Sequence, residues 1–200
     1  MVEISISKLY ILNNMNLKKL NKEVIIIKLD GKNVILSRVT PDDLDFICEL
    51  ECNKDIWLFE EYIESDMNVV REKYLQKMNT PYSYDFIVKS TIEGEVKPIG
   101  LAQIWCYVEH RKSWEIGFAI LPIYQGNGFG YEATKLLIEF AFERLQAHKV
   151  VGMCNCNNLK SVKLMERLGM RREGTFQEEL FWNNQWHDQH FYSILDREYQ

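Results

Sequence analysis

The residues best suited to chemistry are three glycines at alternate positions, Gly126, Gly128 and Gly130, directly before a segment of helical periodicity. Backbone N–H groups at a helix start present fixed donors and about half a positive charge, so a phosphate is the natural ligand. The dinucleotide fingerprint needs its third glycine three residues after the second, and the Walker loop needs Gly-Lys before Ser or Thr, so neither fits. The downstream set of a protein kinase is also absent. Two interpretations of these glycines remain: a phosphate loop of another kind, or a plain glycine-rich turn before a helix.

Cysteines offer a second kind of chemistry. Cys48 and Cys52 are one helical turn apart, and Cys154 and Cys156 share a face if their segment is a strand. Four thiolates could bind zinc. Neither spacing is that of the usual zinc knuckle, however, and free cysteine is common in protein cores. We therefore expect no metal.

The composition limits the function classes. The chain has 200 residues, 46% of them hydrophobic and 26% charged, which is ordinary for a globular protein with a real core. No apolar run approaches the ~20 residues of a membrane span, and a signal peptide's apolar core is absent. With five cysteines, an odd number, these features predict a cytoplasmic protein with free thiols and no membrane partner. A net charge of −5 argues against a nucleic-acid partner and is compatible with a cationic substrate.

The first half of the chain predicts two β-rich runs, two helices and a long strand pair. Asp30-Gly31 is a hairpin signal between the β-rich runs of residues 22–39. Thr40 is a natural N-cap for the next helix, and residues 66–78 predict a second one. Strands follow at residues 84–90, 97–110 and 113–121.

The second half predicts the helix behind the glycines, a buried strand, a short helix and a final hairpin. An apolar stripe on the first helix is formed by Ala133, Leu136, Leu137, Phe140 and Ala141. Residues 149–156 read as the strand and residues 157–169 as the short helix, while a polar turn at Asn183 and Asn184 joins the last two strands. This order predicts an α/β fold with one mixed sheet and helices on both faces.

Two sets of motifs together resemble one known family. Gln125-x-x-Gly128-x-Gly130, after a strand and before an amphipathic helix, resembles the acetyl-CoA pyrophosphate loop of the GNAT acyltransferase superfamily. The second half resembles its RimJ/RimL-type branch, the ribosomal-protein amino-terminal acetyltransferases and their relatives. Its motifs fall in register here as Asn158-x-x-Ser161, Leu168-Gly169-Met170 and Arg172-Glu173-Gly174, with Met170 where the branch usually has Phe. The resemblance runs from about Val34 to the end.

The resemblance implies the GNAT acyl-CoA N-acyltransferase fold, whose central mixed sheet is mostly antiparallel. It implies one domain over residues 22–200, with residues 1–21 as an N-terminal extension. The implied activity is direct transfer of an acetyl group from acetyl-CoA to a primary amine, with no metal and no covalent acyl-enzyme. A homodimer is a possible assembly.

The same resemblance assigns residues to acetyl-CoA. The pyrophosphate would lie on a loop formed by Gln125, Gly126, Asn127, Gly128, Phe129, Gly130 and Tyr131. Gln125 stands where the family has Gln or Arg, so a neutral side chain supports the loop. Pantetheine would pair with the strand edge at Phe118, Ala119 and Ile120, where the Phe118 amide would polarise the thioester carbonyl. Asn158 would hold the pantetheine arm, cap its helix, or do both.

Proton transfer needs a base and a donor. Glu115 is the candidate base; the alternative is a solvated carboxylate near a strand end. Many GNAT enzymes have Tyr four residues beyond the position of Ser161 as the acid, but this chain has Met165, which cannot donate. Ser161, one turn earlier, is therefore the candidate donor to the leaving thiolate, unless it only bonds to its helix cap.

The acceptor is predicted to be a protein or peptide N-terminal α-amine. Its pKa near ~8 leaves about a tenth of it neutral at pH 7, so modest base help suffices. A polyamine or aminoglycoside-like amine is the alternative, and a catalytically inactive acyl-CoA-binding module is another. The expected pocket residues, all of which could equally be core packing, are Trp57, Phe59, Glu60, Glu61, Trp105 and Trp114.

Overall fold

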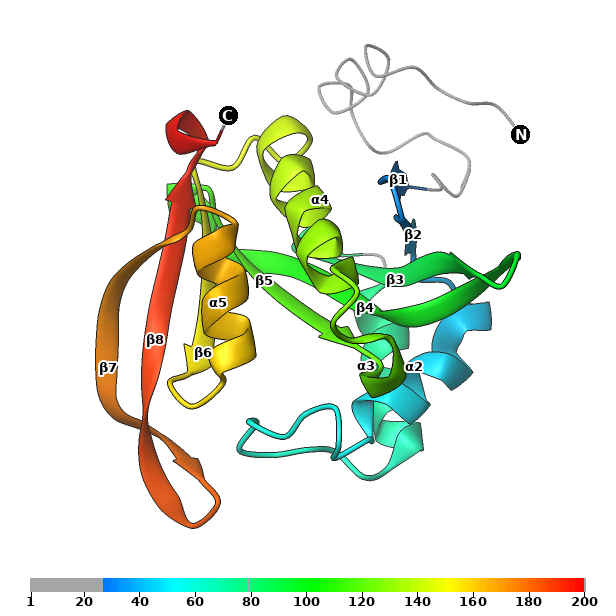
Figure 1. Cartoon of the computed structure of the whole chain (residues 1–200), viewed down its shortest axis with the longest axis horizontal. Helices are drawn as coiled ribbons and strands as arrows, with labels where there is room; N and C mark the ends of the chain where they lie inside the picture. The colour runs from blue at the N-terminus through cyan, green and yellow to red at the C-terminus, as the bar shows by residue number, and fades with distance from the viewer. Residues whose placement is uncertain (1–26, 79, 200) are drawn as a thin grey trace.

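A mixed sheet organises the computed structural model, which describes residues 27–78 and 80–199 (Figure 1). In this part of the chain the strand order is β1-β2-β3-β4-β5-β6-β8-β7, and β5–β6 is the parallel pair among antiparallel neighbours. The strands are β1 (Lys28–Asp30), β2 (Val34–Arg38), β3 (Ser83–Ile92), β4 (Glu95–Val108), β5 (Ser113–Ile120), β6 (Lys149–Asn155), β7 (Arg171–Trp182) and β8 (Gln185–Leu195). The mixed, mostly antiparallel sheet predicted above is confirmed. The predicted extension of residues 1–21 lies outside the described residues, as do residues 22–26.

Helices cover both faces of the sheet, as predicted. On one face, α2 (Leu44–Glu51) and α3 (Met67–Lys77) pack with Ile87, Leu101 and Ala119 of the strands. On the other, α4 (Phe129–Glu143) and α5 (Leu159–Arg167) contribute to the larger core (Figure 1). The predicted stripe of α4 is the buried one, because Leu137 and Ala141 are fully buried. No helix among residues 27–78 and 80–199 is long and apolar enough to cross a membrane.

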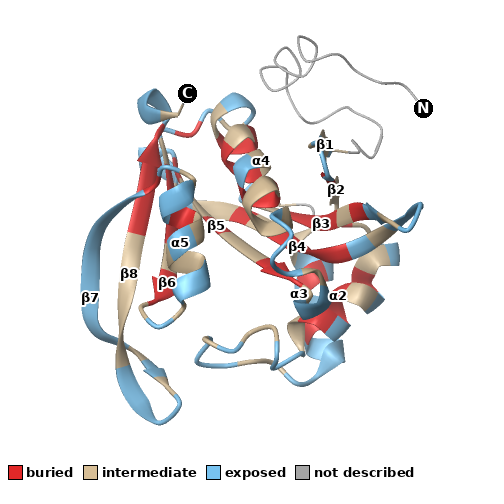
Figure 2. Cartoon of the chain, in the orientation of Figure 1, coloured by how far each residue is buried: buried red, intermediate tan, exposed pale blue. Residues whose placement is uncertain are grey.

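The final hairpin is long, bent and exposed. Asn183 and Asn184 both have positive φ, the backbone of a tight two-residue hairpin turn, which confirms the predicted turn. The β7–β8 register shifts between Phe176 and Leu180, where Glu178 adopts φ +51° and donates its N–H to Asp188 Oδ1 at 3.0 Å. Such a bulge bends a strand. β7 is the edge strand and is exposed over most of its length (Figure 2).

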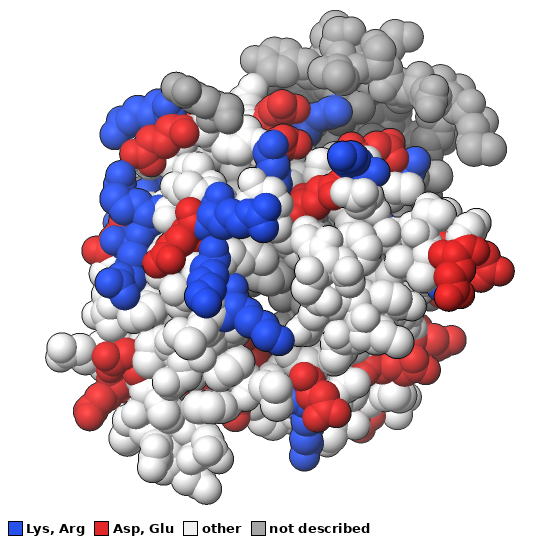
Figure 3. All heavy atoms as spheres, viewed as in Figure 1, with Lys and Arg blue, Asp and Glu red and all other residues white. Residues whose placement is uncertain are grey.

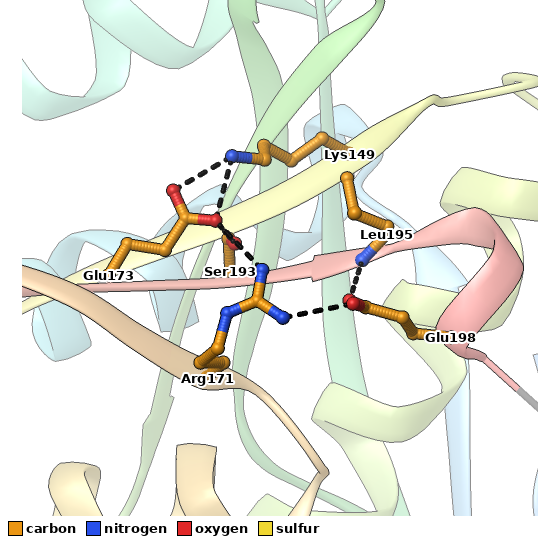
Figure 4. Close-up of polar contacts among 6 residues, drawn as sticks. All are labelled: Lys149, Arg171, Glu173, Ser193, Leu195 and Glu198. Carbon is orange, nitrogen blue, oxygen red and sulfur yellow. Dashed lines mark hydrogen bonds and ion pairs between the residues drawn. The ribbon is translucent and has the colours of Figure 1, made fainter.

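A polar cluster joins this hairpin to the sheet and to the C-terminal turn (Figure 4). Glu173 of β7 accepts hydrogen bonds from Lys149 of β6 at 2.9 Å and from the Ser193 hydroxyl of β8 at 2.7 Å. Arg171 bridges Glu173 and Glu198. The Lys149 ammonium and the Ser193 hydroxyl are the main reasons why the pKa of Glu173 falls to about 2. The cluster thus holds four segments of the chain together.

Candidate active site

The central strands separate in the middle of the sheet. β5 and β6 pair only over Ser113–Glu115 and Lys149–Val151, although β5 continues to Ile120 beside β4. The N–H of Leu121 donates to the Ile99 carbonyl on the β4 side. Because backbone groups alternate along a strand, those of Phe118 and Ile120 point to the opposite, unpaired edge. That edge offers the N–H groups of Phe118 and Ile120 to a ligand, whereas the Ile120 carbonyl already accepts a hydrogen bond from Gln125 Nε2 at 3.0 Å.

A cavity of about 660 Å³ opens below this separation. Glu115 and Phe118 of β5 border it, as do Asn158 and Ser161 at the start of α5. The structure therefore brings together the predicted base, the predicted donor and the predicted pantetheine ligands. Of the predicted pantetheine residues, Phe118 and Asn158 line the cavity, whereas Ala119 and Ile120 do not, because their side chains are buried in the two cores.

Glu115 has the environment of a titrating carboxyl group. Burial raises its pKa to about 7, and the hydrogen bond that Trp105 Nε1 donates at 3.1 Å opposes this only in part. Trp105 and Glu115 are direct partners across β4 and β5, so both face the cavity. A carboxyl group with this pKa can accept or release a proton near neutral pH.

The start of α5 presents one occupied and one available polar group. Asn158 is the N-cap, because its Oδ1 accepts the Ser161 N–H at 3.1 Å. The Ser161 hydroxyl is not used by this cap and makes no hydrogen bond to any residue that the structure describes. One turn later, Met165 is buried against Gly152 and puts a thioether on the cavity wall. Ser161 is thus the hydroxyl of this helix that borders the cavity.

Asn155 is a further polar residue here, and the sequence did not reveal it. It ends β6, borders the cavity and is only 4% exposed. Its Oδ1 accepts two hydrogen bonds from Asn157, which fixes the amide, whereas its buried Nδ2 has no partner among the described residues. A donor in this position is available to a ligand.

The glycine loop has the geometry that its sequence predicts. Gly126 and Gly128 have φ of +83° and +82°, and a β-carbon at either would meet no atom within 4 Å. Gly128 is the N-cap of α4, and the first helical bond runs from Glu132 N–H to its carbonyl. The N–H groups of Phe129, Gly130 and Tyr131 therefore lack helical partners. Asn127 steadies the turn through its Nδ2, which donates to the Tyr124 carbonyl at 3.2 Å.

Five of the six expected acceptor residues line the cavity, namely Trp57, Phe59, Glu60, Glu61 and Trp105. Trp114 does not line it and follows the core-packing alternative: its ring packs on the opposite face, with its centroid 6.0 Å from that of Tyr84. The reason is strand alternation, because Trp114 directly precedes Glu115 and must point the other way.

The end of the bent hairpin contacts the segment of residues 58–61, part of which lines the acceptor side of the cavity. Trp182 Nε1 donates to the Leu58 carbonyl at 2.7 Å, and the Phe181 N–H donates to Glu61 at 2.7 Å. The rings of Phe59 and Trp182 lie 5.3 Å apart. These contacts join segments about 120 positions apart in the chain, so no local pattern predicted them.

A buried polar chain lies behind the acceptor side. Gln103 Nε2 donates to Asp85 at 2.6 Å and to the Tyr74 hydroxyl at 3.0 Å, and Tyr74 in turn donates to Glu51. Burial, followed by the nearby Glu51 charge, raises the pKa of Tyr74, so it stays a neutral donor. Lys77 pairs with Asp85 at 3.0 Å.

The zinc alternative gains no support, because residues 27–78 and 80–199 contain no group of three or more His, Cys, Asp and Glu placed to hold a metal.

Comparison with known proteins agrees with this architecture. Residues 33–171 match the family model of the acetyltransferase (GNAT) domain. The chain is 30% identical to a spermidine N(1)-acetyltransferase of Vibrio cholerae over 78% of this chain and 90% of that one. It is 25% identical to a putative ribosomal N-acetyltransferase, YdaF, of Bacillus subtilis over 85% and 95%. The crystal structure of the Vibrio cholerae spermidine N-acetyltransferase in complex with CoA and spermine superposes with a TM-score of 0.75, at 26% identity over 84% of this chain and 99% of that one.

The matched residues span most of the chain and include both central strands and the glycine loop. The chain therefore belongs to the GNAT acetyltransferase family. It is an N-acetyltransferase of that family.

Proposed function

We propose that this protein transfers an acetyl group from acetyl-CoA to a small cationic amine of the polyamine class. The observation that carries the acceptor class is the charge of the residues that line the cavity beside Glu115. The cavity is lined by five carboxyl groups and by two ammonium groups. The carboxyl groups are those of Glu51, Glu60, Glu61, Glu64 and Glu115, and the ammonium groups are those of Lys73 and Lys77. Lys77 is already paired with Asp85. A slender molecule with several ammonium groups matches this excess of negative charge and its aromatic walls.

Acetyl-CoA supplies the acetyl group as a thioester, and the residues present fit it. The loop of Gly126–Tyr131 would hold the pyrophosphate on free N–H groups, because its glycines leave the backbone uncovered. The unpaired edge of β5 would hold the pantetheine arm, with the Phe118 N–H directed at the thioester carbonyl. Asn158 adds its amide nitrogen beside this edge.

The protein's own groups then move the protons. Glu115 removes a proton from the attacking amine, directly or through one water, since only a neutral amine is a nucleophile. A nitrogen–carbon bond forms as the carbon–sulfur bond breaks. The Ser161 hydroxyl donates a hydrogen bond to the departing sulfur, since Met165 has no donor, and the proton that the nitrogen loses as the amide forms balances the charge of the CoA thiolate.

A second acceptor, a protein N-terminal α-amine, is favoured by the pKa of Glu115. A base with a pKa of about 7 suits an amine whose own pKa is near ~8 better than one near ~10. The homodimer and the cytoplasmic location stay predictions.

The deciding experiment measures release of the CoA thiol from acetyl-CoA with a panel of amines. The panel contains spermidine, spermine, an aminoglycoside, and peptides that begin with Ala, Ser, Met or Asp. We expect turnover with the polyamines and little with the peptides, and a fully N-acetylated spermine is the matched blank. Turnover confined to peptides would reverse the acceptor assignment. Binding of acetyl-CoA without turnover on any amine would leave an inactive acyl-CoA-binding module.

A further inference from the structure

One cation next to the glycine loop has no role in the reaction above. Lys160, in the first turn of α5, donates from Nζ to Gln125 Oε1 at 2.8 Å. Gln125 in turn donates from Nε2 to the Ile120 carbonyl at 3.0 Å, at the end of β5. The loop is thus connected to both the strand and the helix that border the cavity.

The orientation of the Gln125 amide is set by these two neighbours. If the amide were flipped, its oxygen would face the Ile120 carbonyl and its nitrogen would face the Lys160 ammonium. Both contacts would then be repulsive, whereas the observed orientation satisfies both. The ammonium is therefore held at the loop by a fixed acceptor. It has three N–H donors and makes one such bond within the described residues, so donors remain for an anion.

We propose that Lys160 binds the pyrophosphate of acetyl-CoA and supplies the positive charge that Gln125 lacks. This assignment rests on the proposed function, because it concerns the same acetyl-CoA site. The pyrophosphate of acetyl-CoA is negatively charged, and the protein has a net charge of −5. A local positive charge at the loop would therefore favour its binding. A charge-assisted hydrogen bond from an ammonium is stronger than the neutral bonds of the loop alone.

The surroundings of the loop favour this role. Lys and Arg side chains gather over α5 and on its side toward α4 (Figure 3), and the exposed basic residues of α5 are Lys160, Lys163 and Arg167. Arg167 is stacked on the Tyr131 ring at 4.4 Å. The acidic residue of the first turn of α4, Glu132, is turned to Asn33, whose N–H donates to it at 2.7 Å. Of the basic residues of α5, Lys160 is the one that contacts the loop residue Gln125.

The test compares two thioesters and two lysines in the full chain. Lys160→Met should weaken acetyl-CoA binding about tenfold, the order expected for one charge-assisted hydrogen bond at an exposed site. Binding of S-acetylpantetheine, which has no pyrophosphate, should stay unchanged. Lys163→Met, which removes the same charge one turn away, is the control and should change neither affinity. Calorimetry gives all these dissociation constants.

A second variant locates the charge. Gln125→Arg combined with Lys160→Met places a guanidinium on the loop itself and should recover most of the lost acetyl-CoA affinity. Three results would overturn the assignment: unchanged acetyl-CoA affinity in Lys160→Met, an equal loss for both thioesters, or no recovery in the double variant. An equal loss of acetyl-CoA affinity in Lys163→Met would also overturn it, because the general positive charge of α5, and not a bond from Lys160, would then explain the effect. In each case wild-type turnover of acetyl-CoA would still support the proposed function.

Discussion

Trp114 and Glu115 are neighbours in the chain, yet strand alternation sends their side chains to opposite faces of the sheet. Trp114 packs against the larger core beside Tyr84, whereas Glu115 borders the cavity and bonds to Trp105. Burial without a cation partner among the described residues is what raises the pKa of Glu115 to about 7. The same burial has two consequences, one for catalysis and one for stability.

Glu115→Gln should lower kcat/KM for the accepted amine by about 10²- to 10⁴-fold, the usual range for a lost general base. The wild type should lose activity below pH 7 as Glu115 is protonated, and the variant should lack this step. The same substitution should increase the stability of the folded protein above neutral pH. The folded pKa lies above the unfolded one, so ionisation costs stability as pH rises from about 4.5 to about 7.

The variant should therefore be more stable than the wild type by about 1–3 kcal/mol at pH 8 and equal to it at pH 4. Denaturant unfolding at both pH values, with rate profiles on one amine, checks both expectations. If the variant and the wild type are equally stable at both pH values and have the same pH–rate profile, Glu115 is a solvated carboxylate and not the base.

Ser161 can be tested against the helix cap because the two roles use different atoms. The cap uses its N–H, so Ser161→Ala should leave the melting temperature nearly unchanged. Loss of the hydroxyl should lower kcat by about 10- to 1000-fold with little change in acetyl-CoA affinity, since the bond strengthens as sulfur gains charge. Adding Met165→Tyr places a phenol one turn later and should recover part of the rate. A normal kcat in Ser161→Ala would remove this residue from the mechanism.

At the scale of elements, the glycine loop and the turn between β3 and β4 offer a matched comparison. Gly128 and Gly94 have nearly the same φ, +82° and +83°, and neither has an atom within 4 Å of the position of an added β-carbon. Valine at either position should therefore cause similar strain. Only Gly128→Val should also weaken acetyl-CoA binding, by about tenfold or more, because its branched side chain covers the free N–H groups of α4. Calorimetry on both variants checks this, and equal affinities would place the pyrophosphate elsewhere.

The sequence predicted these elements well because their signals are local. Alternating or helical periodicity, glycines with positive φ and caps such as Asn158 act within a few residues. What it missed depends on contacts across the chain. The Glu178 bulge bends the hairpin so that Trp182 reaches Leu58, and the Gln125 amide meets Lys160 from another helix. The unpartnered amide of Asn155 likewise became visible only through its burial.

At the scale of the whole molecule, two carboxyl groups give stability opposite pH dependences. Glu115 has a raised pKa, whereas the pKa of Glu173 is lowered to about 2 by the Lys149 ammonium, the Ser193 hydroxyl and Arg171. A carboxylate whose folded pKa is depressed contributes stability above its unfolded pKa of about 4.5 and loses it as pH falls toward about 2. Glu173 connects β6, β7, β8 and, through Arg171, the C-terminal turn. Its protonation should therefore loosen the attachment of the final hairpin to the rest of the sheet.

Glu173→Gln should lower the melting temperature at pH 7 by about 2–4 °C, the shift expected for about 1 kcal/mol in a domain of this size. The partly exposed position and solvent screening keep the effect this small. The difference from the wild type should shrink steadily below pH 4.5 and vanish only below about pH 2, where Glu173 is protonated in the folded protein as well and both proteins carry a neutral side chain. Glu179→Gln is the control, because Glu179 lies on the same strand, is exposed, and makes no ion pair with a described residue. If both variants melt alike at every pH, net charge and not the cluster governs the acid response of the fold.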